Sequence, residues 1–152
     1  MNERIDLREM EPLIEEMLEK SGNVTLTVAG MSMQPMIYHR RDTFTLERPE
    51  FPLKKYDLPL YKREDGSFIL HRIIKVHKDG SYTCRGDNQR QKEYPVLENQ
   101  IIGVVEKFTR NGKEIVVGRS FGYFVYTRMW GFLRHFKKYY KYVAPIMRKF
   151  KR

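Results

Sequence analysis

The sequence predicts a mostly β, antiparallel domain with a short helix before it and a basic amphipathic helix after it. Three observations carry this prediction: apolar residues alternate with a period of two through the middle of the chain, Asp-Gly or Asn-Gly pairs separate several of the runs, and helical spacing is confined to the two ends. We therefore expect a helix in residues 1–22, a β-rich domain in residues 23–118 and a helical tail in residues 119–152.

The first helix is expected over residues 6–20, because apolar side chains recur there at three- and four-residue spacing. Asp6 is a plausible N-cap, Pro12 leaves the start open, and Ser21-Gly22 ends the segment. The apolar residues are Met10, Leu13, Ile14, Met17 and Leu18.

From Val24 the period changes to two, as expected for a strand. A segment interrupted by Met and Pro follows at 31–37. Further β-like runs lie at 43–47, 58–61, 67–76, 81–85, 101–109 and 113–117. Hairpin turns are predicted at Asp65-Gly66, Asp79-Gly80 and Asn111-Gly112.

The net charge of +10 belongs entirely to the tail. Residues 119–152 hold ten Lys/Arg and no Asp/Glu, whereas residues 1–118 hold 19 of each. From residue 121 the apolar side chains fall on one helical stripe, which Pro145 should kink or end. The stripe consists of Val125, Met129, Phe132, Phe136, Tyr140, Val143 and Met147.

A basic helix with one apolar stripe fits an anionic membrane surface best, so we expect residues 121–152 to bind there. Nucleic-acid binding is the less favoured alternative, and docking on the chain's own domain or on a partner helix is another. No run reaches the ~18 uncharged apolar residues of a simple transmembrane helix, and the N-terminus lacks the apolar core of a signal peptide. We expect a cytoplasmic protein, peripheral to the membrane if the tail binds lipid.

The length of 152 residues suits one domain, and a hydrophobic content of 41% is enough for a core. The single cysteine, Cys84, excludes an internal disulfide framework and a cysteine-based zinc site. We expect no cofactor and no metal.

Ser32 is the candidate nucleophile. It follows a predicted strand and Gly30, where the missing side chain lets the backbone turn sharply, and Pro35 fixes the chain beyond it. A serine at a strand exit can attack a carbonyl, with the N–H groups of Met31 and Ser32 as oxyanion donors. A lone serine in a turn is more often only a capping residue.

A serine nucleophile needs a base, and His71 is the candidate. It lies in the alternating run 67–76, on the face of Ile69 and Ile73, where partial desolvation favours the neutral imidazole. A histidine that serves only the core is the alternative. Its competitors are His39 in a charged loop, His77 at a strand end and His135 in the tail.

Two acids are candidates for orienting the base. Asp87 lies in a Gly-Asp-Asn triplet, and Glu93 follows six residues later. A carboxylate beside an imidazole fixes its tautomer and orientation. Asp87 can equally cap a turn, and Glu93 can equally be a solvated charge.

Three segments resemble the signal peptidase and LexA-type peptidase clan. Residues 30–35, Gly-Met-Ser-Met-Gln-Pro, resemble its nucleophile box. Residues 70–73, Leu-His-Arg-Ile, resemble the general-base box of endoplasmic-reticulum-type signal peptidases, in which histidine replaces the bacterial-type lysine. Residues 85–88, Arg-Gly-Asp-Asn, resemble that branch's Gly-Asp-Asn box, and its third triad acid corresponds to Glu93.

The resemblance spans roughly residues 22–118. Residues 55–61 resemble the strand before the base, with Tyr56 in place of the usual glycine, and Gly103 fits the closing strand. Gly30 stands where many signal peptidases carry a hydroxyl donor, and glutamate replaces the usual triad aspartate at Glu93. We expect neither the N-terminal membrane anchor of signal peptidases nor the DNA-binding domain of LexA-like repressors.

The resemblance implies a β-rich catalytic domain and a serine endopeptidase in which His71 deprotonates Ser32. It also implies a peptide or protein substrate that binds as an extended strand, with small residues near the cut. The rival hypothesis is a peptidase-fold binding module with little or no activity.

Overall fold

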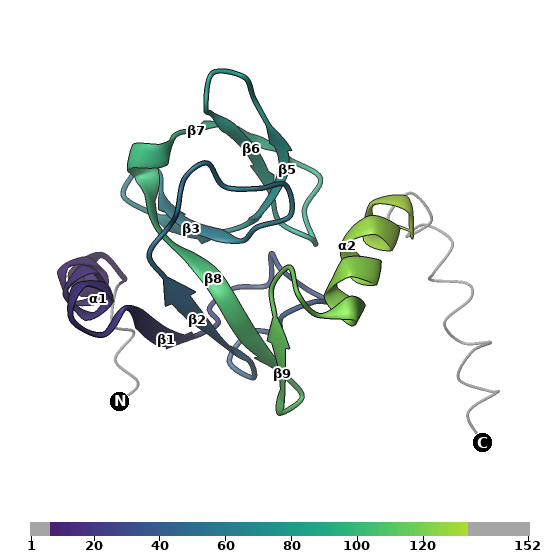
Figure 1. The fold of residues 1–152 in the computed structure, drawn as a ribbon, viewed down its shortest axis with the longest axis horizontal. Helices are drawn as coiled ribbons and strands as arrows, with labels where there is room; N and C mark the ends of the chain where they lie inside the picture. The colour runs from purple at the N-terminus through teal and green to yellow at the C-terminus, as the bar shows by residue number, and fades with distance from the viewer. Residues whose placement is uncertain (1–6, 134–152) are drawn as a thin grey trace. The chain divides into compact units, whose positions relative to one another are not determined.

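The structure is a computed structural model that describes the backbone of residues 7–133 and the side chains of residues 11–130. The chain divides into two compact units, the body (residues 1–118) and the tail (residues 119–152), and each is described by itself. The predicted fold class is confirmed at the level of secondary structure: the chain is mostly antiparallel β, with one helix before the strands and one after them (Figure 1).

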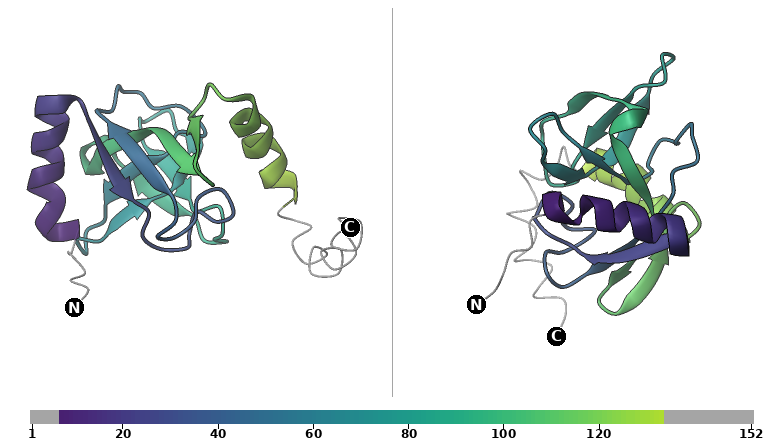
Figure 2. Two further views of the ribbon diagram at one scale, coloured as in Figure 1. Left: turned by 90° about the horizontal axis from the view of Figure 1, so that it is seen from below. Right: turned by 90° about the vertical axis from the view of Figure 1, so that its left-hand side faces the viewer.

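Helix α1 covers Leu7–Ser21, one residue later than predicted, and it continues across Pro12. The predicted N-cap, Asp6, lies outside the described residues. Ile14 and Leu18 are buried, and a Leu18 methyl group lies 3.6 Å from the position that a side chain at Gly103 would occupy. The helix lies beside strand β1 (Asn23–Thr27) (Figure 2). The burial of Ile14 and Leu18 shows that its apolar face is turned toward the sheet.

The larger sheet has the order β1-β2-β8-β3-β4, and β9 also pairs with β8. All its pairings are antiparallel, and β1 and β4 are edge strands, as is β9, which pairs with β8 alone. Its remaining strands are β2 (Thr43–Glu47), β3 (Pro59–Lys62), β4 (Phe68–Leu70), β8 (Ile101–Arg110) and β9 (Lys113–Val116).

The smaller sheet has the order β5-β6-β7, with β5 at Arg72–Val76, β6 at Tyr82–Arg85 and β7 at Glu93–Val96. A short 3-10 helix, η1 (Glu98–Gln100), leads from it to β8. The two sheets share one buried cluster that draws side chains from both of them. It contains Leu53, Tyr61, Ile73, Tyr82, Cys84, Val96, Ile101 and Val104.

The predicted strand 67–76 is wrong as a single element, because the structure divides it at His71. The part before His71 is β4, which pairs with β3 in the larger sheet, and the part after it is β5, which pairs with β6 in the smaller sheet. His71 therefore lies where the chain crosses between the sheets, and the predicted alternation of faces does not extend through it. Strand β7 was not predicted, because Pro95 and the charged residues around it hide the alternation.

The three predicted hairpins are confirmed. They join β3 to β4, β5 to β6 and β8 to β9. Gly66, Gly80 and Gly112 have φ angles of 80°, 83° and 74°, the left-handed conformation that glycine adopts without steric cost. In the first two turns an aspartate carboxylate also accepts the N–H of the serine two residues later, at 2.8 Å and 3.0 Å.

Helix α2 covers Phe121–Leu133, and its start agrees with the predicted helical pattern. The rest of the predicted tail helix, with Pro145 and His135, lies outside the described residues. Within residues 7–133, no helix combines the length and the apolar character that a membrane crossing requires.

Candidate active site

Ser32 lies in a tight segment of turns, residues 30–37, between β1 and β2. Gly30 begins the segment with a φ angle of 90°, and its N–H donates a hydrogen bond to His39 Nδ1 at 2.9 Å. The segment is anchored by buried side chains, namely Met33, Met36 and Ile37. Because both ends are fixed, the half-buried Ser32 is held in place by its backbone.

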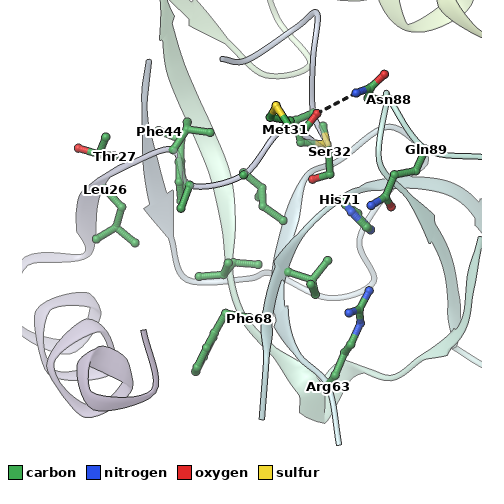
Figure 3. Close-up of a pocket in the computed structure, with 17 residues that line it drawn as sticks. Leu26, Thr27, Met31, Ser32, Phe44, Arg63, Phe68, His71, Asn88 and Gln89 are labelled. Carbon is green, nitrogen blue, oxygen red and sulfur yellow. Dashed lines mark hydrogen bonds between the residues drawn. The ribbon is translucent and has the colours of Figure 1, made fainter. Parts of the chain in front are cut away.

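The loop 86–88 packs directly against Ser32. The Ser32 carbonyl oxygen accepts the N–H of Asn88 at 2.7 Å, and the Asn88 amide donates to the Met31 carbonyl oxygen at 3.3 Å (Figure 3). A Cβ atom on Gly86 would lie 2.7 Å from the Ser32 carbonyl oxygen, which is closer than real Cβ contacts come. Glycine at position 86 therefore allows the loop to approach Ser32.

His71 stands beside Ser32 at the same place. The Cβ position at Gly86 lies 3.0 Å from Ser32 Cβ and 3.0 Å from His71 Nε2, so this ring nitrogen is a neighbour of the serine. Figure 3 shows Ser32, His71 and Gln89 gathered at one side of the groove. Within the described part of the chain no hydrogen bond joins Ser32 Oγ to His71. Such bonds are often long or poorly aligned before substrate binds.

The other ring nitrogen of His71 faces an acid. Its Nδ1 atom lies 3.1 Å from Glu93 Oε1 and 3.3 Å from the Tyr61 hydroxyl. A carboxylate accepts hydrogen bonds but donates none when it is ionised, so it favours the tautomer that carries its proton on Nδ1. Nε2 is then the proton-accepting nitrogen, on the side of Ser32.

Arg63 holds Glu93 in this position. The arginine follows β3, and the glutamate begins β7. Arg63 Nε donates to Glu93 Oε2 at 2.9 Å, and a terminal guanidinium nitrogen of Arg63 bonds to Oε1. This two-point contact fixes the plane of the carboxylate as well as its distance from His71.

Burial sets the protonation of the pair. The His71 side chain is 1% exposed, and the loss of solvent lowers its pKa below the ordinary 6.5, although the Glu93 charge acts to raise it. Burial also acts to raise the pKa of Glu93, but hydrogen bonds from Arg63 and Tyr61 outweigh it and leave that pKa lowered. Near neutral pH the site therefore combines a neutral imidazole with an ionised carboxylate.

Asp87 makes a different ion pair. Its two carboxylate oxygens accept Arg72 Nε at 2.8 Å and a terminal Arg72 nitrogen at 2.7 Å. Both side chains are almost completely buried. Arg72 also donates to the Tyr56 carbonyl oxygen at 3.3 Å. The pair thus ties the loop that contacts Ser32 to the start of β5, whereas Glu93 is the acid at His71 Nδ1.

The backbone N–H groups of Met31 and Ser32 have no acceptor among the described residues. The Met31 carbonyl oxygen accepts Gln34 N–H at 3.3 Å as well as the Asn88 amide. Because the peptide plane sets the Ser32 N–H opposite the Met31 carbonyl, this N–H points away from those two donors.

The site opens into a groove of about 500 Å³. Residues of two edge strands, β1 and β4, line this groove together with the segment that carries Ser32. Apart from Arg63 and His71 its lining is uncharged, and much of it is apolar. The apolar side chains include Leu26, Val28, Phe44, Leu60, Phe68 and Leu70. Figure 3 labels three of them, Leu26, Phe44 and Phe68.

The competing histidines have other surroundings. His39 Nδ1 accepts the Gly30 N–H, so that nitrogen is occupied. His77 Nε2 lies 2.7 Å from Thr83 Oγ1, and its ring lies 4.6 Å from that of Tyr94, in the smaller sheet. His135 lies outside the described residues. Within residues 7–133 we find no group of three His, Cys, Asp or Glu side chains placed to hold a metal ion.

The sequence alone did not predict a role for Arg63, or for Tyr61 at the imidazole. Arg63 and Glu93 are 30 residues apart, and no local pattern connects them. A charged residue at the end of a strand that precedes a predicted turn is the only signal, and it is a weak one.

No protein-family model matches this sequence, and a search of curated proteins found no significant match.

Proposed function

We propose that the chain is a serine endopeptidase of the signal peptidase and LexA-like type, with Ser32 as the nucleophile and His71 as the general base. The observation that carries the proposal is the arrangement around one imidazole: Nε2 beside Ser32 and Nδ1 at 3.1 Å from Glu93. This order of nucleophile, base and acid is the one that acyl transfer by serine requires.

The proposed reaction begins when His71 Nε2 removes the proton from Ser32 Oγ. Oγ attacks the carbonyl carbon of the scissile peptide, and the N–H groups of Met31 and Ser32 stabilise the oxyanion. His71 then protonates the leaving amine, and water hydrolyses the acyl-enzyme by the reverse sequence of proton transfers. Glu93 stabilises the imidazolium that forms in both steps.

The groove supports an extended peptide as the substrate. Edge strands carry backbone groups that have no partner within their own sheet, and a peptide can pair with them as an added strand. Residues of β1 and β4 both line the groove, so one peptide can lie between them. Apart from Arg63 and His71 the lining carries no charge, which favours a segment with few charged residues around the cut.

Two backbone features agree with the resemblance. Tyr56 has a φ angle of 84°, in the region that favours glycine, and it occupies the position where the resembled family has glycine. Gly86, from the Arg-Gly-Asp-Asn segment, is the residue whose missing side chain leaves room for Ser32 and His71.

One observation favours the rival hypothesis of a binding module with little activity. Ser32 Oγ and His71 Nε2 are neighbours, but they make no hydrogen bond in the described part of the chain. A peptidase site requires this contact to form when the substrate binds, whereas a binding module does not.

The test is a digest of a peptide library, analysed by mass spectrometry for the wild type beside Ser32→Ala. We expect the wild type to produce cleaved peptides that share a sequence preference, and Ser32→Ala to produce none. If both proteins leave every peptide intact but retain some of them on a column, the binding module is correct. Equal cleavage by both proteins would indicate a contaminating protease and would leave Ser32 without a role.

A further inference from the structure

Helix α2 exposes large apolar side chains on one face. Phe121 is 81% exposed, Phe124 49% and Met129 50%. At 3.6 residues per turn these three positions fall on one side of the helix. They belong to the tail and take no part in the candidate active site.

The same face carries one cation in direct contact with an aromatic ring. The Arg128 guanidinium lies 3.5 Å from the centre of the Phe124 ring, one turn away. An arginine that covers a ring with its charge directed outward suits a boundary between apolar and polar media. Tyr126 and Trp130 stack on each other with their centres 5.4 Å apart, and both residue types are enriched at membrane interfaces.

Charge identifies the kind of surface that fits this face. Residues 119–152 hold ten Lys/Arg and no Asp/Glu, and the body contributes no net charge to offset them. Each basic residue near an anionic lipid surface contributes binding free energy, and the contribution falls as salt screens it. Apolar exposure and an unopposed positive charge thus occur in the same short segment.

We propose that the exposed face of α2 docks on an anionic membrane surface, with the helix lying in the plane of the interface. Nucleic acid fits this face less well, because Met129 offers no ring on which a base could stack and Arg128 already covers one face of Phe124. The proposal does not depend on peptidase activity.

A flotation assay tests the proposal without a fluorescent probe, because the only tryptophan of the chain, Trp130, lies on the opposite side of α2 from Phe121. The full chain is mixed with vesicles of phosphatidylcholine and phosphatidylglycerol in equal parts, or of phosphatidylcholine alone. We expect the anionic vesicles to carry the protein upward in a flotation assay. This binding should weaken as salt is added.

Two sets of variants test the apolar side chains and the positive charge of the tail separately. Replacing Phe121, Phe124 and Met129 together by serine should weaken binding on the order of a hundredfold, because three apolar side chains no longer enter the interface. The matched control replaces three exposed apolar residues of the body, Leu13, Phe51 and Leu97, by serine and should bind like the wild type. Circular dichroism verifies that each variant is folded.

A second set tests charge without altering the apolar face. Replacing Lys137, Lys138 and Lys141 by glutamine should also weaken binding on the order of a hundredfold, and the loss should shrink in high salt. Unchanged vesicle binding by the α2 serine variant would overturn the proposal, as would an equal loss in the body control. Binding to single-stranded RNA or DNA without binding to vesicles would replace it with the nucleic-acid alternative. Ser32→Ala should bind vesicles like the wild type, so failure of the proposed peptidase activity would leave this result intact.

Discussion

Two arginine–carboxylate pairs lie near His71, and they have the same chemistry in different surroundings. Arg72 and Asp87 make two hydrogen bonds to each other, and their side chains are 4% and 3% exposed. Arg63 and Glu93 also make two contacts, but their side chains are 39% and 19% exposed, and Glu93 reaches His71 as well. What a carboxylate contacts besides its arginine therefore decides its role: Asp87 holds a loop, and Glu93 holds an imidazole.

Burial makes the two pairs differ in free energy as well. Removing one partner of a buried ion pair leaves an uncompensated charge and costs about 3–5 kcal/mol, whereas an exposed pair contributes about 0–1 kcal/mol. The Arg72–Asp87 pair should therefore matter most for folding. The Arg63–Glu93 pair should matter most for the proposed reaction.

The largest expected effect is the loss of cleavage when the nucleophile or the base is removed, and the losses expected for the two ion pairs are smaller. Ser32→Ala and His71→Ala should each reduce peptide cleavage by at least about 10⁴-fold without unfolding the body, because each removes one party to the same proton transfer. The double variant should be no worse than either single one. The measurement is kcat/KM on a peptide selected from the library digest, with circular dichroism on each variant. Full activity in His71→Ala would remove this histidine from the mechanism and direct attention to His39.

Because the two acids have different surroundings, we expect loss of Asp87 to reduce mainly stability and loss of Glu93 to reduce mainly cleavage. Asp87→Asn should lower the free energy of unfolding by about 3–5 kcal/mol, because it leaves the buried Arg72 charge uncompensated. Glu93→Gln should lower stability much less, yet reduce kcat/KM by about a hundredfold or more, though by less than the loss of Ser32. Urea unfolding and kinetics on the same preparations make the comparison. If Glu93→Gln is silent while Asp87→Asn is folded and inactive, Asp87 is the acid that orients His71.

A substitution at Gly86 tests whether loop 86–88 sets the geometry of the site by its close packing against Ser32 and His71. A Cβ there would lie 2.7 Å from the Ser32 carbonyl oxygen and 3.0 Å from His71 Nε2, so Gly86→Ala must displace the serine segment or the imidazole. A displacement on the order of 1 Å should reduce kcat/KM by about a hundredfold. Gly122→Ala is the matched control, because a Cβ there meets nothing within 4 Å. Wild-type activity in Gly86→Ala would show that the loop tolerates movement and does not set the geometry.

The sequence predicted the local features of this site but not its long-range ones. The three hairpin turns follow from short residue pairs, since the conformation of a turn depends on its own residues. The division of strand 67–76 at His71 depends instead on which sheet each half joins, and alternation of side chains is the same in both sheets. The contact between Arg63 and Glu93 joins residues that are distant in sequence, so no local period contains it. The sequence alone therefore could not decide whether Asp87 or Glu93 approaches the imidazole, because the packing of the two sheets decides it.

The His71 titration should also govern stability. Burial lowers the His71 pKa, so the folded state binds this proton less readily than the unfolded chain does. Neutral His71 therefore makes its full contribution to the stability of the folded state above the ordinary pKa of 6.5, and this contribution is lost as the pH falls below it. Urea unfolding of the wild type from neutral to mildly acidic pH should show this loss. His71→Gln should show a smaller one, and an equal loss in both would assign it to other groups.

The smallest expected effect is a shift in the pH profile of kcat/KM. Its direction should differ between a variant of Glu93 and a variant of Arg63. Cleavage requires neutral His71, so kcat/KM should rise with pH through a His71 pKa that burial holds below 6.5. The Glu93 charge raises that pKa and the Arg63 charge lowers it. Glu93→Gln should therefore move the acid limb of the pH profile to lower pH, and Arg63→Met should move it to higher pH.

Both consequences of losing Arg63 act in the same direction on His71. A positive charge disappears, and the Glu93 carboxylate keeps the Tyr61 hydrogen bond but loses the arginine that competes with the imidazole, so each change favours the protonated ring. Asp87→Asn should move the limb to lower pH by less than Glu93→Gln does, because the Asp87 charge acts on the His71 pKa more weakly. Profiles of kcat/KM against pH for the three variants, on one uncharged peptide, measure these shifts. If Glu93→Gln and Arg63→Met move the limb in the same direction, the pair does not act on His71 through its charges, and its role is limited to holding the ring in place.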